Sequence, residues 1–293
     1  TEGSCISMQT SETSAHAAAE NQELSKALDA FQDYLLRQNM ASNTITAYVY
    51  GVKHFYSCYD RLSPDNISLY KVSLMDHYQP QTVNIRIRAL NCFLKFLGIR
   101  DYKIRAVRVQ QKSYLDHVIS QADYEYLKRR LWEDEQYTFY FIVRFITATG
   151  VRVSELVMFQ VADVHRGYKD LYSKGNKMRR IYIPSSLQKD AMDWLKAEGR
   201  RTGPLFLSHL GSCISISGIR AQLKTYACRY NLDPKVVYPH SFRHRFAKNF
   251  IENGGDIAFL SNLLGHDSIE TTRIYLRRTS TEQAQIFNQV VNW

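Results

Sequence analysis

The sequence predicts a mainly α-helical protein of two domains, a helical N-terminal bundle and a mostly helical second domain with a small antiparallel β-sheet. Three observations predict this architecture. Apolar residues recur at three- and four-residue spacing through most of the chain after residue 21, a basic stretch without clear periodicity interrupts them near residue 101, and only one short segment resembles a β-hairpin. With 293 residues, the chain is long enough for two domains that each bury a core.

The N-terminal region divides into an arm and a bundle. Residues 1–21 are small and polar and lack the apolar core of a secretory signal, so we expect a flexible arm. Over residues 22–100 the apolar spacing predicts a compact helical domain. One helix begins near Gln22, a second begins near Ser42 as its N-cap, and a third follows Pro80 and stops at Gly98.

A basic stretch over residues 101–115 is interpreted as the linker between the domains. Its cations are spaced so that they could follow a phosphate backbone, and the candidate DNA contacts are Lys103, Arg105, Arg108 and Lys112. The alternative is a solvated charged linker without a binding role.

The second domain is expected over residues 116–293. It begins near Ser120, where Ser-x-x-Asp resembles a capping box, and a strongly apolar helix leads to Gly150. Between Tyr168 and Pro184 the pattern predicts two short strands around a Gly-Asn turn. Helices resume over residues 187–198 and 216–230 and continue nearly to the end of the chain.

Charge and cysteine content narrow the class of protein. The net charge of +10 favours a polyanionic partner, with nucleic acid first, although a merely soluble basic protein is the alternative. The five cysteines are scattered and form no C-x-x-C pair, which favours free thiols in a reducing compartment over a disulfide framework or a zinc site. No run approaches the roughly 18 apolar residues that span a bilayer, so we expect no membrane partner.

Three separate strings contain residues suited to phosphate chemistry. In ATGVRVSEL, Arg152 follows a helix-ending glycine, and Glu155 lies three residues later, where it could hold the arginine. In HSFRHRFAKNF, His240 and Arg243 share a helical face. His244 lies four residues after His240, but the metalloprotease pattern fails and no third ligand is evident, so we predict no metal.

The third string, LLGHDSIETTRIYLRR, contains Leu263, Gly265 and His266, with Tyr275 nine residues beyond the histidine. Among twenty tyrosines, only position can single one out.

Together these strings resemble the boxes of the tyrosine recombinase (phage integrase) family, in particular its Xer-like and transposon-encoded members. TGVRVSEL matches the first box, His240, Arg243 and His244 match H-x-x-R-H, and Leu263 to Tyr275 match the third box. SKGNKMRRIYIP resembles the family's hairpin and places its catalytic lysine at Lys174, with Lys177 as the competing choice. The chain departs from the family's pattern at three places. Ser173 stands where the hairpin usually has a glycine, and Arg245 replaces a residue that is usually small. Tyr275 is followed by Leu276-Arg277, where many relatives have a histidine at the second position.

The resemblance implies a mainly α-helical fold with an N-terminal core-binding domain and a catalytic domain. It implies that Tyr275 attacks a DNA phosphate to form a 3′-phosphotyrosyl link, while Arg152 and Arg243 neutralise the phosphate and favour the phenolate. Lys174 would protonate the leaving 5′-oxygen, His240 would act as acid and base, His266 would donate to the phosphate, and Glu155 would orient the first box. No metal and no cofactor are expected.

The expected partner is double-stranded DNA. The resemblance implies that four copies of the chain assemble on it as a homotetramer, in which each apolar C-terminal tail docks into a neighbouring subunit. Accessory proteins are further expected partners. The alternative is that the tail docks on its own core. The resemblance places the enzyme in the cytoplasm, associated with the nucleoid when bound to DNA. Rival interpretations are a type IB topoisomerase-like enzyme and a catalytically silent DNA-binding accessory protein; a metal-dependent nuclease is weaker because the chain lacks a carboxylate cluster.

Overall fold

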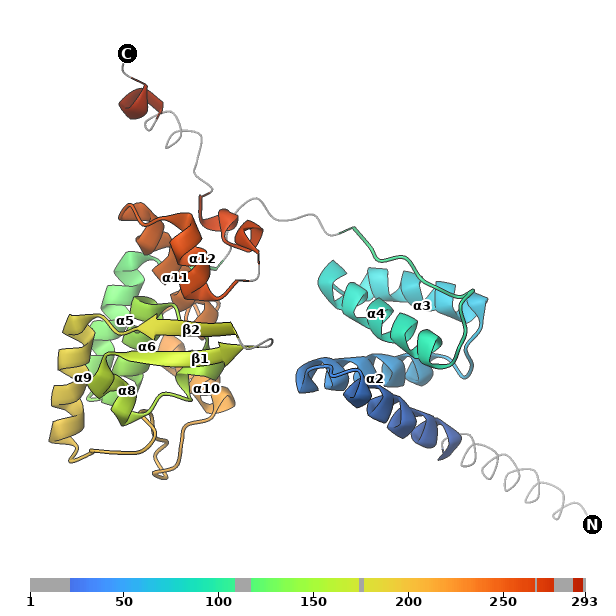
Figure 1. Ribbon diagram of the computed structural model, residues 1–293, viewed down its shortest axis with the longest axis horizontal. Coiled ribbons are helices and arrows are strands. Elements are labelled where there is room, and N and C mark those ends of the chain that lie inside the picture. The colour runs from blue at the N-terminus through green and yellow to red at the C-terminus, as the bar shows by residue number, and fades with distance from the viewer. Residues whose placement is uncertain (1–21, 109–116, 174–176, 267, 277–286, 292–293) are drawn as a thin grey trace, which may run out of the picture. The chain divides into compact units, whose positions relative to one another are not determined.

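The computed structural model describes residues 22–108, 117–173, 177–266, 268–276 and 287–291 (Figure 1). The chain divides into two compact units, with the boundary between Gln111 and Lys112. The predicted arm over residues 1–21 lies outside the described residues, as do parts of the predicted linker and of the C-terminal tail. Within the described ranges, no helix is both long and apolar enough to cross a membrane.

The first unit is helical, as predicted. Helix 22–37 is followed by α2 (Ser42–Cys58), α3 (Pro64–His77) and α4 (Pro80–Phe96), and Gly98 ends the last turn with a positive φ of 77°. Helices α2 and α4 approach closely at Gly51, where an added Cβ would lie 2.8 Å from the Cβ of Ala89. A buried aromatic and aliphatic core joins these helices through Phe31, Phe55, Leu90 and Phe93.

Two details of this unit differ from the prediction. Helix α2 begins at Ser42, but its N-cap is Ala41 and no side chain caps it, so the expected Ser42 cap is wrong. Helix α3 was not predicted, because exposed apolar residues such as Leu69 and Val72 obscure the buried stripe of Ile67, Tyr70 and Leu74. Its start was nevertheless signalled: Ser63 accepts a hydrogen bond from the Asn66 amide, and proline occupies the first helical position.

Residues 101–108, predicted as the start of the linker, are irregular but held against α4. The Asn91 side chain bonds the backbone N–H and C=O of Ile104 at 2.9 and 2.8 Å, and Asn84 does the same for Val107 at 2.8 and 2.9 Å. Ile104 is buried in the bundle core. Because paired amides satisfy the backbone groups of the segment, it is fixed on the first unit and leaves Lys103, Arg105 and Arg108 exposed.

The second unit is mostly helical with one small sheet. Its described elements are α5 (Gln121–Glu133), α6 (Tyr137–Thr149), α7 (Val153–Leu156), α8 (Val161–Arg166), β1 (Tyr168–Ser173), β2 (Lys177–Tyr182), α9 (Ser185–Ala197), α10 (Ile216–Arg229), α11 (Pro239–Glu252), α12 (Ile257–Leu264) and the 3₁₀ turns η1 (Ile269–Thr271) and η2 (Arg273–Leu276). Residues 287–290 are helical again. Ser120 caps α5 by accepting from the Asp123 amide, as the Ser-x-x-Asp pattern predicts.

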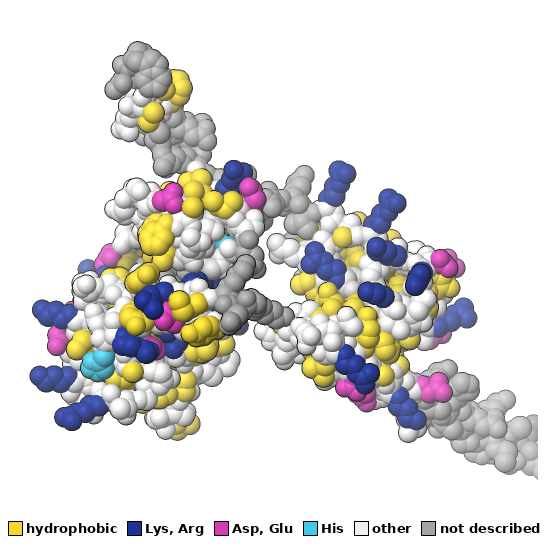
Figure 2. Space-filling model, viewed as in Figure 1, with side chains coloured by type: hydrophobic (Ala, Val, Ile, Leu, Met, Phe, Trp, Pro, Cys, Tyr) yellow, Lys and Arg dark blue, Asp and Glu magenta, His cyan; other side chains and the backbone are white. Residues whose placement is uncertain are grey.

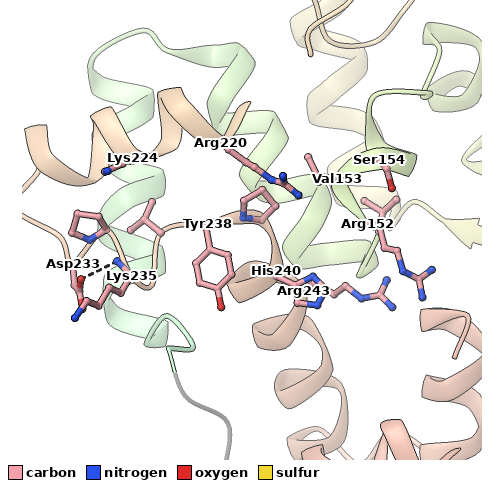
Figure 3. Close-up of a pocket in the computed structure, with 14 residues that line it drawn as sticks. Arg152, Val153, Ser154, Arg220, Lys224, Asp233, Lys235, Tyr238, His240 and Arg243 are labelled. Carbon is pink, nitrogen blue, oxygen red and sulfur yellow. Dashed lines mark hydrogen bonds between the residues drawn. The ribbon is translucent and has the colours of Figure 1, made fainter. Parts of the chain in front are cut away.

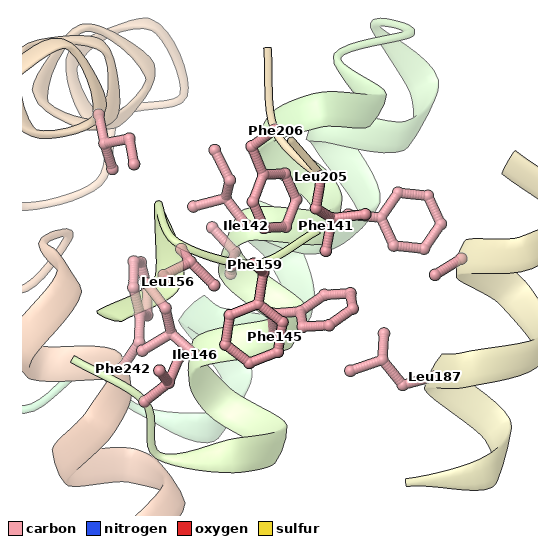
Figure 4. Close-up of a cluster of buried hydrophobic side chains, with 14 of the residues drawn as sticks. Phe141, Ile142, Phe145, Ile146, Leu156, Phe159, Leu187, Leu205, Phe206 and Phe242 are labelled. Carbon is pink, nitrogen blue, oxygen red and sulfur yellow. The ribbon is translucent and has the colours of Figure 1, made fainter. Parts of the chain in front are cut away.

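Helix α6 lies at the centre of the unit and packs against α5, α9 and α11. Its buried face includes Phe141, Phe145 and Ile146, which meet Phe159 and Phe242 in one apolar cluster (Figure 4). Truncating such a buried phenylalanine costs about 3–5 kcal/mol of stability. The core therefore holds α6 in place, including its C-terminal end at Thr149, which the first motif follows.

The predicted hairpin is present. Strands β1 and β2 pair antiparallel, with Tyr168 opposite Tyr182 and Ser173 opposite Lys177. The turn over residues 174–176 lies outside the described residues, and so does the predicted catalytic lysine, Lys174. The side chain of its competitor, Lys177, is likewise not described.

Candidate active site

Gly150 shapes the backbone at the first motif. It ends α6 in the left-handed region, with φ of 66°, and an added Cβ would come within 2.4 Å of the Phe246 ring. This turn makes Arg152 the N-cap of α7. The Gly150 carbonyl also accepts a hydrogen bond from Arg243, which joins the first and second motifs. A glycine is therefore required here by both backbone conformation and space.

Three arginines converge on the C-terminal end of α12. Arg243, which is 2% exposed, donates to the Leu264 carbonyl at 2.6 Å, and Arg179 from β2 donates to the same carbonyl. Arg152 donates to the Gly265 carbonyl at 3.0 Å. The last carbonyls of a helix lack intrahelical donors and carry partial negative charge. They can therefore hold several guanidinium groups together without a carboxylate for each one.

Glu155 binds two of these arginines. Its carboxylate accepts from the Arg152 backbone N–H at 2.9 Å, from the Arg152 guanidinium at 3.0 Å and from Arg179 at 2.6 Å. The expected contact between Glu155 and Arg152 is thus present, and Arg179 extends it to the hairpin strand. Burial lowers the pKa of Arg179, and it lowers that of Arg243 to about 10 with help from the Arg152 charge. Arg243 still remains protonated at neutral pH.

His266 is fixed on both sides of its ring. Its Nδ1 lies 2.8 Å from the hydroxyl of Thr272, which is fully buried, and its Nε2 lies 3.2 Å from an Arg243 nitrogen. Because arginine only donates, Nε2 accepts and Nδ1 carries the proton that is donated to Thr272. Burial, followed by the charges of Arg243, Arg152 and Arg179, lowers the pKa of His266 to about 4.

His240 lies at the exposed start of α11, where partial desolvation and the charges of Arg243, Arg152 and Arg220 lower its pKa. These charges favour the neutral imidazole.

Tyr275 is buried in η2, with 6% of its surface exposed, against Ala247, Ile251 and Leu260. Its hydroxyl lies 2.6 Å from His244 Nδ1. Arg243 lowers the pKa of the phenol, but burial outweighs this effect and raises the pKa to about 12. Arg243 therefore favours the phenolate, as expected, but in the chain without DNA burial has the larger effect and keeps the phenol protonated.

An open cleft of about 930 Å³ lies beside these motifs. Five of its lining side chains are Arg or Lys, and the lining includes one carboxylate, that of Asp233 (Figure 3). Arg152, Arg220, His240 and Arg243 lie together on one side, and Lys224 and Lys235 lie on the other (Figure 3). The cleft is therefore strongly positive and suits a polyanion. Tyr275 lies outside the set of residues that line it.

The structure thus brings together six residues that the sequence singled out, namely Arg152, Glu155, His240, Arg243, His266 and Tyr275. Lys174 and Lys112 lie outside the described residues. Lys103, Arg105 and Arg108 are exposed on the first unit. In the described part of the chain, no group of three or more His, Cys, Asp or Glu side chains is placed to hold a metal ion.

Sequence reasoning missed contacts of three site residues. Arg179 matches the arginine of the hairpin motif, but its partners lie 24 and 85 residues away in sequence. His244 was matched to the H-x-x-R-H box and weighed as a metal ligand, but its contact with Tyr275 was not predicted. Thr272 lies six residues after His266, and its contact with that ring was not predicted. Arg245, a departure from the family pattern, donates to the Ile119 carbonyl at 2.8 Å and so anchors the start of the unit to α11.

Comparisons with known proteins agree with this geometry. Residues 117–282 match the family described as the phage integrase family. Tyrosine recombinase XerD of Staphylococcus haemolyticus is 34% identical over 158 residues, which cover 50% of this chain and 52% of XerD. That alignment spans about half the length of the relative. Tyrosine recombinase XerA of Pyrococcus furiosus is 27% identical over 263 residues, 87% of this chain and 91% of XerA.

Solved structures share the fold. A crystal structure of XerA recombinase matches with a TM-score of 0.52 and 24% identity, covering 92% of this chain and 99% of that one. The Tn1549 transposon integrase, solved in complex with transposon right end DNA, matches with a TM-score of 0.70 and 15% identity, covering 91% and 99%. The family match covers more than half of the chain and includes all three motifs around Arg152, Arg243 and Tyr275, so this chain belongs to the phage integrase family, the tyrosine recombinases.

Proposed function

We propose that this protein is a site-specific DNA recombinase that cleaves and rejoins strands through a 3′-phosphotyrosyl intermediate and a Holliday junction. It would integrate, excise or resolve a mobile element. The observation that carries the proposal is the convergence of Arg152, Arg243 and His240 on one positive cleft, next to a buried tyrosine on η2. Binding alone would need the positive charge but not the tyrosine.

The proposed chemistry follows from where charge develops. Arg152 and Arg243 would neutralise the phosphate as it becomes pentavalent, and removing one such donor costs about 3–4 kcal/mol of barrier. His240 would act at the phosphate as acid and base, and Glu155 would keep Arg152 in place. His266 would donate to the phosphate from Nε2 once the bound anion favours a second proton on its ring. Lys174 would protonate the leaving 5′-oxygen. One phosphodiester is exchanged for another, so the reaction conserves bond energy.

The active geometry requires a change from the structure described above. Tyr275 is buried and does not line the cleft, so its hydroxyl must approach the phosphate when DNA binds. The shift would break the packing of Tyr275 against its buried apolar neighbours, and the short 3₁₀ turns η1 and η2 that follow α12 are the elements that would move. DNA binding and nucleophile placement would then be coupled.

The first unit would contact DNA through its cations. Figure 2 shows Lys and Arg side chains spread over the visible face of this unit, and Lys103, Arg105 and Arg108 are exposed beside it. We propose that they hold the phosphate backbone in a nonspecific way. The Tn1549 integrase and a lambda integrase dimer, both structural neighbours, were solved bound to DNA. Such an enzyme would act in the cytoplasm on the nucleoid.

We also propose a tetramer joined by the C-terminal tail. Phe287 and Val290 are 63% and 61% exposed on a helix over residues 287–290, so an apolar stripe is available to a neighbouring subunit. Two further apolar residues of the tail, Ile286 and Trp293, lie outside the described residues. Accessory proteins would act on this assembly.

The test is recovery of protein-linked DNA from expressing cells under denaturing conditions, with Tyr275→Phe as the matched control. The proposal expects one enriched DNA sequence with wild type and none with the variant. DNA recovered evenly from the whole genome would favour a topoisomerase-like enzyme. If wild type retains no DNA, the proposed function fails and a silent DNA-binding role replaces it.

A further inference from the structure

His244 contacts the atom that would attack DNA. Its Nδ1 lies 2.6 Å from Tyr275 Oη, and the two rings are 5.6 Å apart between α11 and η2. A tyrosine hydroxyl near neutral pH has a proton to donate. The short contact is therefore a hydrogen bond from the phenol to an imidazole nitrogen, provided that His244 carries its own proton on Nε2.

The surroundings of His244 favour the neutral ring that this bond requires. The groups that face it are His240 and Arg243 on α11, His266 after α12, and Tyr275 itself. Burial, followed by the charges of His240, Arg243 and His266, lowers its pKa to about 4. Its ring stacks edge-on to that of His240 at 4.9 Å, yet His240 lines the cleft. The two histidines of the second motif therefore lie at different places, His240 at the cleft and His244 at the Tyr275 hydroxyl.

We infer that His244 is the general base that removes the phenol proton when Tyr275 attacks the DNA phosphate, and that the two side chains keep their contact as Tyr275 approaches the cleft. This inference rests on the proposed function and deepens it by naming a catalytic residue. In the cleavage step, the Tyr275 Oη–P bond forms, the P–O5′ bond breaks, the phenol proton moves to His244 Nδ1, and Lys174 supplies a proton to the leaving 5′-oxygen. In the rejoining step, the imidazolium returns its proton to the departing phenol oxygen.

The electrostatics explain why the transfer waits for DNA. In the chain alone, the phenol pKa is about 12 and that of His244 is about 4, so the proton stays on the tyrosine. A phosphodiester bound by Arg152 and Arg243 would offset the positive charge of Arg243, which is one of the causes of the lowered pKa of His244. Bonding of Oη to phosphorus makes the phenol a far stronger acid at the same moment. Both changes favour transfer in the transition state.

The discriminating variant is His244→Asn, because the asparagine side-chain oxygen can accept the phenol hydrogen bond but cannot take its proton. Cleavage would be followed on a duplex carrying the sequence enriched in the covalent complexes, beside His165→Asn, which removes an exposed histidine on α8. We expect His244→Asn to slow cleavage about 100- to 10,000-fold, the usual range for a lost acid or base, and His165→Asn to match wild type. Thermal unfolding would verify that the variant is folded.

Two further readouts separate a base from a residue that only positions Tyr275. The cleavage rate of His244→Asn should rise about tenfold per pH unit above neutrality, because only ionised phenol attacks, while that of wild type rises less. A 5′-phosphorothiolate, whose thiolate leaves without a proton, should rescue Lys174→Ala but not His244→Asn. If folded His244→Asn cleaves as fast as wild type, or if the 5′-phosphorothiolate restores its cleavage, the inference about His244 is wrong while the proposed function stands. Absence of any wild-type covalent complex would overturn the proposed function with it.

Discussion

Arg179 on β2 lies 2.6 Å from Glu155 on α7, and the ion pair is mostly buried, with 13% and 18% of the two side chains exposed. Arg179 also donates to the Leu264 carbonyl at the end of α12. The hairpin strand is thereby tied to the first motif and to the start of the third. In the sequence, Lys174 lies between the two strands of the hairpin. The contacts of Arg179 therefore connect the strand that follows the proposed acid to the elements that hold Arg152 and Arg243.

Arg179→Ala should therefore impair both stability and cleavage. Removing one partner of a mostly buried pair leaves Glu155 undercompensated, so we expect a loss of about 2 kcal/mol in the free energy of unfolding. Arg179→Lys should not restore cleavage, because one ammonium group cannot reproduce the forked contact to a carboxylate and a carbonyl. Urea unfolding and covalent-complex yield measure the two effects. Full activity of the lysine variant would contradict the account.

Gly150→Ala should destabilise the protein more than Gly199→Ala. Both glycines have φ of 66°, so both substitutions strain the backbone by about 1–2 kcal/mol. Only at Gly150 does the new Cβ meet other atoms, the Phe246 ring at 2.4 Å, whereas Gly199 has nothing within 4 Å. We expect a further loss of about 1–3 kcal/mol at Gly150 from overpacking. Equal changes in Tm for the two variants would show that the close packing at Gly150 is unimportant.

Thr272→Val should release His266. The substitution keeps the side-chain shape and removes the hydroxyl that accepts from His266 Nδ1 at 2.8 Å. We expect a loss of about 1 kcal/mol of stability and a lower cleavage rate, because the ring can then adopt the other tautomer or rotate. Thr272→Ser should recover most of the rate. The histidine tautomer can be followed by ¹⁵N NMR, and an unchanged His266 signal in Thr272→Val would refute the assignment.

Acidification should destabilise the site. His244 and His266 have pKa values of about 4 in the folded chain, below the ordinary value of about 6.5 that applies after unfolding. The unfolded chain therefore binds protons first as the pH falls. The stabilisation is complete above about pH 6.5 and is lost as the pH falls towards 4. Unfolding by urea across this range should show a shallower pH dependence for His244→Asn than for wild type; parallel curves would contradict the folded pKa of His244.

The cations of residues 101–108 should govern salt dependence rather than sequence choice. If each contacts one phosphate, Lys103→Ala, Arg105→Ala and Arg108→Ala should each reduce the slope of log affinity against log salt by about 0.9. Affinity for target and scrambled duplexes should fall by the same factor. A loss confined to the target duplex would mean that these side chains read bases.

The sequence predicted those parts of the fold that depend on local patterns. The apolar run before Gly150, the hairpin between Tyr168 and Tyr182 and the helix of His240 and Arg243 all contain their signals within a few residues. Helix α3 was not predicted because its exposed face also carries apolar residues, among them Leu69 and Val72. A helix of this kind is decided by tertiary packing, which periodicity reports only weakly.

The site was predictable in its residues but less so in its contacts. The resemblance of the three motifs to the family's boxes identified Arg152, Arg243 and Tyr275. The Leu264 carbonyl accepts hydrogen bonds from Arg179 and Arg243, and a backbone acceptor of this kind has no sequence signature. Arg179 lies 85 residues away from it in the sequence. The raised pKa of Tyr275 depends on its burial, whereas sequence reasoning had weighed only the charges of its neighbours.

The most direct test of the central claim is to identify the amino acid joined to DNA. Covalent complexes formed by wild type would be digested with nuclease and trypsin, and the adduct located by mass spectrometry. The account predicts a nucleotide linked through its 3′-phosphate to Tyr275 and a free 5′-hydroxyl on the released strand. An adduct on any other residue, or a 5′-phosphate linkage, would contradict it.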